Sequence, residues 1–188
     1  MITTSKLALH ARRTYLDGKL QPATLFLQNG RIQSIQKGKP ENISCPLEDL
    51  GDVVLMPGIL DAHVHVNEPG RTFWEGFDTA TKAAAAGGIT TLVDMPLNSS
   101  PVTTSPENFK LKLAAAEGKS HVNVGFWGGV VPENASEMEA LLRSGVLGIK
   151  VFLTHSGIEE FPNVTAADLR KAMPVIAKTG LPLLVHCE

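Results

Sequence analysis

The stretch that decides the fold is residues 53–65, which reads VVLMPGILDAHVH. A nearly continuous apolar run of this kind is typical of a strand that is buried on both faces in a parallel sheet. His63 and His65 end the run two positions apart, and alternate side chains of a strand lie on one face. Two imidazoles on one face can chelate a borderline-soft cation such as Zn²⁺. The stretch therefore predicts a buried strand that ends either in a metal chelate or in a pair of solvated histidines.

Apolar strand-like segments and helix-like segments alternate from this stretch to the end of the chain. Glycines follow the helical segments at the places where helices should end. Repeated β-α units with apolar strands predict a parallel sheet covered by helices, and hence an α/β fold. The predicted strands are residues 58–65, 89–95, 121–127, 148–153 and 182–187, and the predicted helices are residues 75–86, 106–117, 136–143 and 166–178.

Residues 1–52 have a different pattern, with short strands and turns. An Asn29-Gly30 pair separates two strand-like segments, and it suits the positive φ angles of a tight hairpin turn. We therefore expect a small N-terminal β module at residues 1–52. A second domain is expected at residues 53–188.

The second domain is too short for a closed barrel. Residues 53–188 provide about five β-α units, whereas a typical (β/α)₈ barrel has about 250 residues. A natural domain seldom ends at a strand whose covering helix is missing. We therefore expect a partial (β/α)₈ TIM barrel of about the first five strands, and we expect the chain to be the N-terminal part of a larger enzyme. A smaller, complete doubly wound fold is the alternative.

The composition excludes several classes of protein. The chain has 188 residues, of which 43% are hydrophobic and 19% charged, and its formal net charge is −2. It therefore has no basic excess for nucleic acid. No apolar run approaches the roughly 20 residues needed to cross a bilayer, and the N-terminus lacks the order of a secretory signal. Two cysteines fit a reducing compartment, so we expect a cytoplasmic protein without nucleic-acid or membrane partners.

Two later strands carry further candidate ligands. Lys150 interrupts the apolar run of residues 146–153, and His186 ends the run of residues 181–186. A lysine inside an apolar strand must lose its charge, pair with an anion or extend its ammonium into solvent. His186 is either a ligand or a neutral, hydrogen-bonded core histidine. Because metal sites in parallel barrels form late in the strands, both residues could join the histidine pair. Asp94, at the end of the second strand, is expected to hydrogen-bond the backbone around this site.

The pattern resembles the amidohydrolase superfamily, and within it the cyclic-amidase branch of allantoinases, dihydroorotases and dihydropyrimidinases. The resemblance is strongest over residues 56–77 and over residues 94–98, which read DMPLN, and it extends over nearly the whole chain. It implies that residues 1–52 are half of a small β-sandwich and that residues 53–188 are the first five strands of the barrel. It also implies metal-dependent hydrolysis of the C–N bond of a cyclic amide.

The resemblance gives each candidate ligand a role. It implies two Zn²⁺ ions per site in the complete enzyme, and it implies that Lys150 is carboxylated and bridges them. The implied ligands in this chain are His63, His65, Lys150 and His186. A further histidine of the family's site, and the aspartate that serves as its acid/base group, have no counterpart here. We therefore assign no catalytic residue, and we expect the 188-residue chain alone to be inactive.

The segment after the histidine pair discriminates within the branch. Dihydroorotases carry an arginine where this chain has Asn67. An amide can hydrogen-bond a neutral ureide but offers no fixed cation for a carboxylate. Asn98 matches a position that contacts the cyclic substrate in these enzymes, although it also fits a loop-capping role. Asn67 and Asn98 are thus the candidate substrate-binding residues. The pattern resembles the allantoinases and implies hydrolysis of the hydantoin ring of allantoin to allantoate in purine catabolism.

The resemblance leaves two other interpretations open. One is a dihydropyrimidinase, a hydantoinase or a dihydroorotase-like hydrolase, which would differ in substrate profile. The other is a non-catalytic protein, either a truncated form or a scaffold paralogue. For partners, the resemblance implies a small-molecule ureide substrate and a homo-oligomer, commonly a tetramer.

Overall fold

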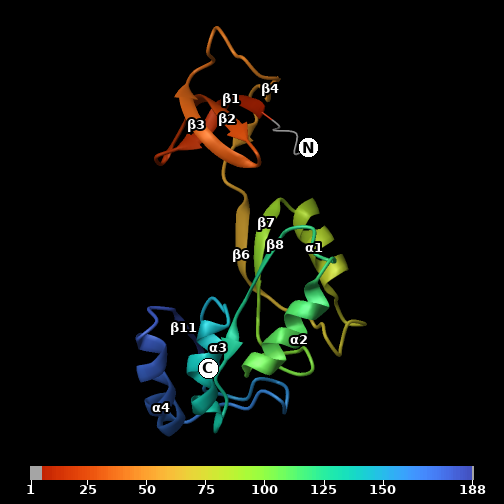
Figure 1. Cartoon of the computed structure of the whole chain (residues 1–188), viewed down its shortest axis with the longest axis vertical. Coiled ribbons are helices and arrows are strands. Elements are labelled where there is room, and N and C mark those ends of the chain that lie inside the picture. Colours follow the sequence, from red (N-terminus) through yellow and green to blue (C-terminus); the bar gives the residue numbers. More distant parts are fainter. Residues whose placement is uncertain (1–5, 188) are drawn as a thin grey trace. The chain divides into compact units, whose positions relative to one another are not determined.

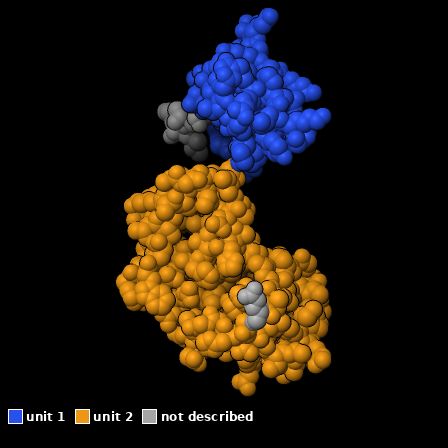
Figure 2. All heavy atoms as spheres, turned by 180° about the vertical axis from the view of Figure 1, so that it is seen from behind, with its two compact units in different colours: residues 1–57 blue, residues 58–188 orange. Residues whose placement is uncertain are grey.

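The computed structural model of the chain describes residues 6–187. The chain divides into two compact units, Met1–Pro57 and Gly58–Glu188 (Figure 2). In the described residues, the regular elements of the first unit are all strands, and the second unit alternates strands with helices. The boundary expected from the sequence, between residues 52 and 53, falls shortly before the junction of these units.

The first unit is a sheet in the order β3-β2-β1-β4 (Figure 1). Strand β5 also pairs with β1. Strands β1, β2 and β3 are antiparallel neighbours, whereas β4 and β5 run parallel to β1. The strands are β1 (Lys6–Leu16), β2 (Lys19–Gln28), β3 (Arg31–Lys37), β4 (Leu47–Asp49) and β5 (Val54–Leu55).

The turn between β2 and β3 is the hairpin expected from the sequence. Asn29 and Gly30 form it with φ angles of 54° and 74°, and Gln28 pairs with Arg31 across it. Positive φ at both central residues is the geometry of a type I′ turn, whose twist matches that of the flanking strands. The predicted hairpin is confirmed.

The second unit is an α/β structure with parallel strands. Its sheets are ordered β6-β7-β8 and β11-β10-β9. The strands are β6 (Ile59–Val64), β7 (Ile89–Asp94), β8 (Asn123–Phe126), β9 (Gly128–Gly129), β10 (Ile149–Phe152) and β11 (Leu183–His186). The helices are α1 (Phe77–Ala86), α2 (Pro106–Ala116), the 3₁₀ helix η1 (Asn134–Glu137), α3 (Met138–Arg143) and α4 (Ala166–Ala177).

The two sheets of this unit meet at Trp127, between β8 and β9. The N–H of Trp127 donates to the carbonyl of Asp94 in β7, at 2.9 Å. The N–H of the next residue, Gly128, donates to the carbonyl of Gly148 beside β10, also at 2.9 Å. One strand segment therefore pairs with β7 on one side of Trp127 and with β10 on the other. As a result, neighbouring strands follow one another in chain order.

The predicted elements of the second unit are found close to their expected positions, with two differences in the helices. The first helix was expected from residue 75, but it begins at Phe77, because Gly76 is extended at φ −116° and ψ 169° and forms the N-cap. The third helix was expected as one piece, but its first turn is the 3₁₀ helix η1. Such 3₁₀ turns are frequent at the N-termini of α-helices.

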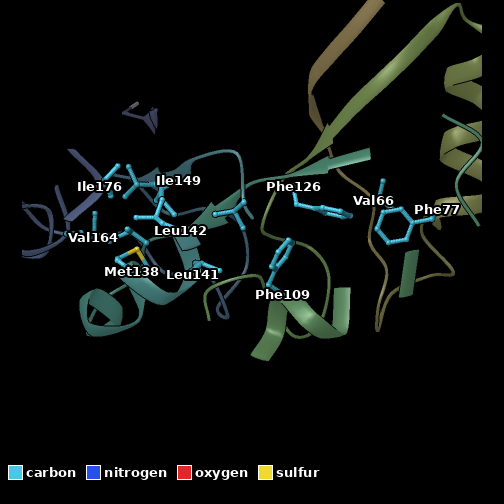
Figure 3. Packing of buried hydrophobic residues seen from close by; sticks show 14 residues of the cluster. Val66, Phe77, Phe109, Phe126, Met138, Leu141, Leu142, Ile149, Val164 and Ile176 are labelled. Atoms are coloured by element: carbon cyan, nitrogen blue, oxygen red, sulfur yellow. The ribbon is translucent and has the colours of Figure 1, made fainter. Parts of the chain in front are cut away.

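Apolar side chains between the helices and the sheets hold the second unit together. Figure 3 shows Phe77 of α1 and Phe109 of α2 beside Phe126 of β8. The ring centroids lie 6.1 and 5.6 Å from that of Phe126, in edge-to-face geometry. In the same cluster Met138 of α3 is fully buried, as is Ile149 of β10. This packing fixes the strands whose carboxyl ends carry the candidate site residues.

Candidate metal and substrate site

The candidate residues lie at or near the carboxyl ends of parallel strands. His63 is in β6 and Lys150 is in β10, whereas His186 ends β11. Asn67 follows β6 in the chain, and Asn98 follows β7. In parallel α/β sheets this edge is where ligands bind, because the loops there are free of the strand ladder.

His63 lies in β6 and His65 directly follows this strand, and the two side chains lie side by side. The ring centroids of His63 and His65 are 5.4 Å apart, as expected for alternate residues of a strand. The N–H of His63 donates to the carboxylate of Asp61 at 3.0 Å, which fixes the backbone before the pair. Burial lowers the pKa of the His65 imidazole, and the neighbouring charge of His63 lowers it further. His65 is therefore favoured in its neutral form, which is the form that binds metals.

Asn98 contacts this histidine pair from the loop after β7. Its side-chain Nδ2 lies 3.4 Å from Nδ1 of His65. Its backbone is in the left-handed region, with a φ of 75°, a conformation that asparagine tolerates better than most residues. The structure thus places one of the two predicted substrate-binding residues directly against a predicted metal ligand.

Lys150 is buried in an apolar environment. It is 5% exposed, and its Nζ lies 4.8 Å from the ring centroid of Phe152. Burial lowers the pKa of this lysine, and Cys187 opposes this shift only as the smaller cause. Of the three alternatives expected for such a lysine, the solvated ammonium is therefore disfavoured. The amine is suited to lose its charge or to become an anion by modification.

His186 shares a face of the sheet with this lysine. Its imidazole stacks on the ring of Phe152, with centroids 4.7 Å apart and planes at 14°. The register of β10 and β11 pairs Phe152 with His186 directly. Lys150 and His186 therefore flank the same aromatic ring from neighbouring strands.

The structure brings the four predicted ligands together as two pairs. His63 lies beside His65, and His186 and Lys150 each lie against the ring of Phe152. Within residues 6–187, no three His, Cys, Asp or Glu side chains are grouped closely enough to hold a metal by themselves. A common site for all four residues thus stays a prediction.

The chemistry of these donors fits a divalent cation. Neutral imidazoles are preferred ligands of Zn²⁺, and the burial of Lys150 favours the uncharged amine.

Asn67 gives a second indication of a ligand. It is 8% exposed, and its side-chain Oδ1 is buried without a hydrogen-bond partner in the described part of the chain. A buried amide oxygen without a partner is unfavourable by about 1–3 kcal/mol, so this atom is available to a bound molecule.

A buried ion pair supports the backbone beside the histidine pair. The carboxylate of Asp94 accepts the N–H of Val66 at 2.7 Å, so its expected role in binding the backbone is confirmed. Its other oxygen lies 2.6 Å from Nζ of Lys112, and both side chains are at most 1% exposed. The sequence analysis missed Lys112, although its place three residues after the buried Phe109 puts it on the inner face of α2.

Arg71 was also missed by the sequence analysis. Its Nη1 donates to the backbone carbonyl of Asn98 at 2.9 Å, and its Nη2 pairs with the carboxylate of Glu160. No sequence signal links these three residues, because they lie in loops that are far apart in the chain. Their contact follows only from the parallel arrangement of the strands.

The chain belongs to the amidohydrolase family, whose sequence model matches residues 54–188. Among curated relatives, a probable allantoinase of Oryza sativa subsp. japonica is 52% identical over 91% of this chain and 35% of its own length. An allantoinase of Arabidopsis thaliana is 48% identical over 96% of this chain and 37% of its own. The chain thus spans little more than a third of the length of these relatives.

Solved structures with a similar fold include hydantoinases and a dihydropyrimidinase. An L-hydantoinase (dihydropyrimidinase) from Arthrobacter aurescens superposes with a TM-score of 0.88 at 25% identity, over 98% of this chain and 41% of that one. The likeness covers both compact units. In the part of the chain that the structure describes, no helix is long and apolar enough to cross a membrane.

Proposed function

We propose that the full-length protein carrying this sequence is a metal-dependent cyclic amidase that hydrolyses the hydantoin-ring amide of allantoin to allantoate. The observation that carries the proposal is the pair His63 and His65 with Asn98 against it, in a chain 48–52% identical to proteins named allantoinase. The substrate would be a small neutral ureide. We further propose that the protein is a cytoplasmic homo-oligomer, and specifically a tetramer. Analytical sedimentation would measure the size of this assembly.

The fold proposed for the complete protein is a (β/α)₈ barrel with a small β-sandwich. Residues 53–188 would supply the first five strands of the barrel, and residues 1–52 would supply half of the sandwich. Parallel strands that follow one another in chain order, with helices between them, support the barrel. The similarity to the hydantoinase over both units supports the same architecture.

The proposed ligands in this chain are His63, His65, Lys150 and His186, for two Zn²⁺ ions. When bound, the ions would supply a hydroxide at neutral pH and polarise the ring carbonyl. Burial lowers the pKa of Lys150 and so favours the amine with a free electron pair. That pair can form a bond to the carbon of CO₂, and loss of one proton then leaves a carbamate anion. Carboxylation would in this way replace a buried cation by an anion with two oxygen donors.

The two asparagines would bind and orient the substrate. A ureide ring presents N–H donors and carbonyl acceptors without a net charge, and an amide side chain can both donate and accept hydrogen bonds. Asn67 has a buried oxygen free to accept, and the amide of Asn98 lies beside His65. Neither residue offers a fixed cation, so a carboxylated ring such as dihydroorotate would lack a partner.

The test is allantoin hydrolysis by the full-length protein. We expect activity to be lost on chelation and restored by Zn²⁺. We also expect His63→Ala and His65→Ala each to lower kcat/KM by more than roughly a hundredfold, because loss even of a group that supports a ligand lowers activity by about 10–100-fold. The matched control is His155→Ala, an exposed histidine of the loop after β10. Full activity in both ligand variants would overturn the proposal.

A second candidate function is a hydantoinase or dihydropyrimidinase, which the structural similarity to the L-hydantoinase favours. Comparing kcat/KM for allantoin, hydantoin, dihydrouracil and dihydroorotate distinguishes these activities. Preference for hydantoin or dihydrouracil over allantoin would replace the first proposal by the second. Absence of hydrolysis and of bound metal would instead favour a non-catalytic paralogue.

A further inference from the structure

The guanidinium of Arg71 joins three loops at the carboxyl edge of the sheets. Arg71 lies in the loop after β6, and its Nη1 donates to the carbonyl of Asn98 in the loop after β7, at 2.9 Å. Its Nη2 pairs with Glu160 in the segment that follows β10. Its Cζ lies 5.3 Å from the ring centroid of Trp74, which covers one face of the guanidinium.

The contact with Asn98 is the one that bears on the site. Asn98 is held at a φ of 75°, and its side-chain amide lies 3.4 Å from Nδ1 of His65. A hydrogen bond to its carbonyl therefore restrains both the unusual backbone conformation and the direction of the side chain. The loops are also linked beside it, because the N–H of Ser100 donates to the carbonyl of Pro69 at 2.8 Å.

The geometry requires an arginine. A guanidinium is a rigid planar fork that can donate to two acceptors in different directions, whereas an ammonium is a point charge on a flexible chain. The side chain of Arg71 is 20% exposed and that of Glu160 is 43% exposed. An ion pair this exposed adds little to the stability of the protein. Its effect is therefore to fix the orientation of the guanidinium of Arg71.

We propose that Arg71 is a positioning residue for the cyclic amide: it fixes Asn98 against His65 and couples the segment around Glu160 to that arrangement. This inference rests on the proposed function, because the substrate is the ureide assigned there. Arg71 does not touch the substrate in this account. It acts through Asn98, whose amide would bind the ring.

The first experiment measures kcat and KM of the full-length protein for allantoin. We expect Arg71→Gln to lower kcat/KM by roughly tenfold, mainly through KM, because a hydrogen bond from a charged donor is lost. Arg143→Gln is the matched control, since Arg143 pairs with Glu139 on an exposed helix surface. In an Asn98→Ala background, Arg71→Gln should change kcat/KM by less than about twofold, because the residue it acts through is already gone. Losses that multiply in the double variant, or unchanged kcat/KM in the single variant, would overturn the inference.

The second experiment needs no substrate and measures amide hydrogen exchange in the same protein. Arg71→Gln should speed exchange at Ser100 and in residues 155–162 by about fivefold, the effect of about 1 kcal/mol. Glu160→Gln should speed exchange only in residues 155–162, because the bond to Asn98 remains. Unchanged exchange at Ser100 in Arg71→Gln would refute the inference even if the wild type hydrolyses allantoin. Conversely, a wild type that does not hydrolyse allantoin would refute the proposed function while exchange still tests the coupling.

Discussion

Two opposite charges are buried beside the backbone that follows His65. Asp94 and Lys112 are 0% and 1% exposed, and their carboxylate and ammonium are 2.6 Å apart. Burial raises the pKa of Asp94 to about 6, although Lys112 and the N–H of Val66 act in the opposite direction. Since Val66 follows His65 in the chain, the pair supports the backbone that holds this histidine. A buried pair of this kind stabilises a geometry more than it stabilises the fold.

The pH dependence of this pair can be predicted. The pKa of Asp94 is about 6 in the folded protein, above its ordinary 3.8, so the folded state binds this proton more tightly. The stability that the proton contributes is lost as the pH rises from about 4 to about 6. Lys112→Met removes the cation that holds this pKa down, so the pKa should rise further and the loss should extend to higher pH.

We therefore expect Lys112→Met to lower the free energy of unfolding by about 3–5 kcal/mol near neutral pH, and by less at about pH 5. Denaturant unfolding of the full-length protein at the two pH values measures this. Lys110→Met, an exposed lysine on the same helix, is the control and should change stability little. An equal effect of Lys112→Met at both pH values would contradict the account of Asp94.

At the scale of the element, helix α1 obtains its cap from a distant residue. Its N-cap is Gly76, which has no side chain to accept the first N–H groups. The carboxylate of Glu68, nine residues earlier, accepts the N–H of Phe77 at 3.0 Å instead. Glu68 is 6% exposed, and its other oxygen pairs with Lys119. A negative charge at this end also complements the helix dipole. The cap thus fixes the loop that contains Asn67 to the start of α1.

Replacing this cap should destabilise the protein. We expect Glu68→Ala to lower the free energy of unfolding by about 1–3 kcal/mol, because the N–H of Phe77 loses its acceptor and Lys119 loses the carboxylate with which it pairs. Glu107→Ala is the control, since Glu107 is an exposed acid in the first turn of α2. It should change stability by about 0.5 kcal/mol or less. Thermal or denaturant unfolding measures both, and equal effects of the two variants would argue against the capping role.

The elements could be predicted more fully than the contacts between them. Apolar runs and glycines place the strands and helices to within a few residues, since both signals are local. The parity of His63 and His65 predicts their shared face for the same reason. The cap at Glu68, the partner of Asp94 and the contacts of Arg71 join residues 9 to 89 positions apart. Such contacts depend on how loops pack, and no periodic pattern in the sequence encodes them.

At the scale of the whole molecule, the sheets of the second unit have two edges. Among the described residues, β6 pairs only with β7 and β11 pairs only with β10. Apolar side chains are exposed at these edge strands, with Leu60 at 58% and Val185 at 44%. Unpaired edges with exposed apolar side chains promote association between chains. These edges are also where further parallel strands of a barrel would pair.

The 188-residue chain by itself should therefore associate and should not hydrolyse allantoin. We expect it to bind an apolar dye and to scatter light at micromolar concentration, and we expect the full-length protein to do neither, because its further strands would cover both edges. Leu60→Lys should reduce association of the 188-residue chain, since a charge on an edge strand opposes pairing. Leu111→Lys, at a residue of similar exposure on α2, is the control and should leave association unchanged. A 188-residue chain that is monomeric and binds no dye would show that these edges are already protected, and would contradict the expectation that further strands cover them.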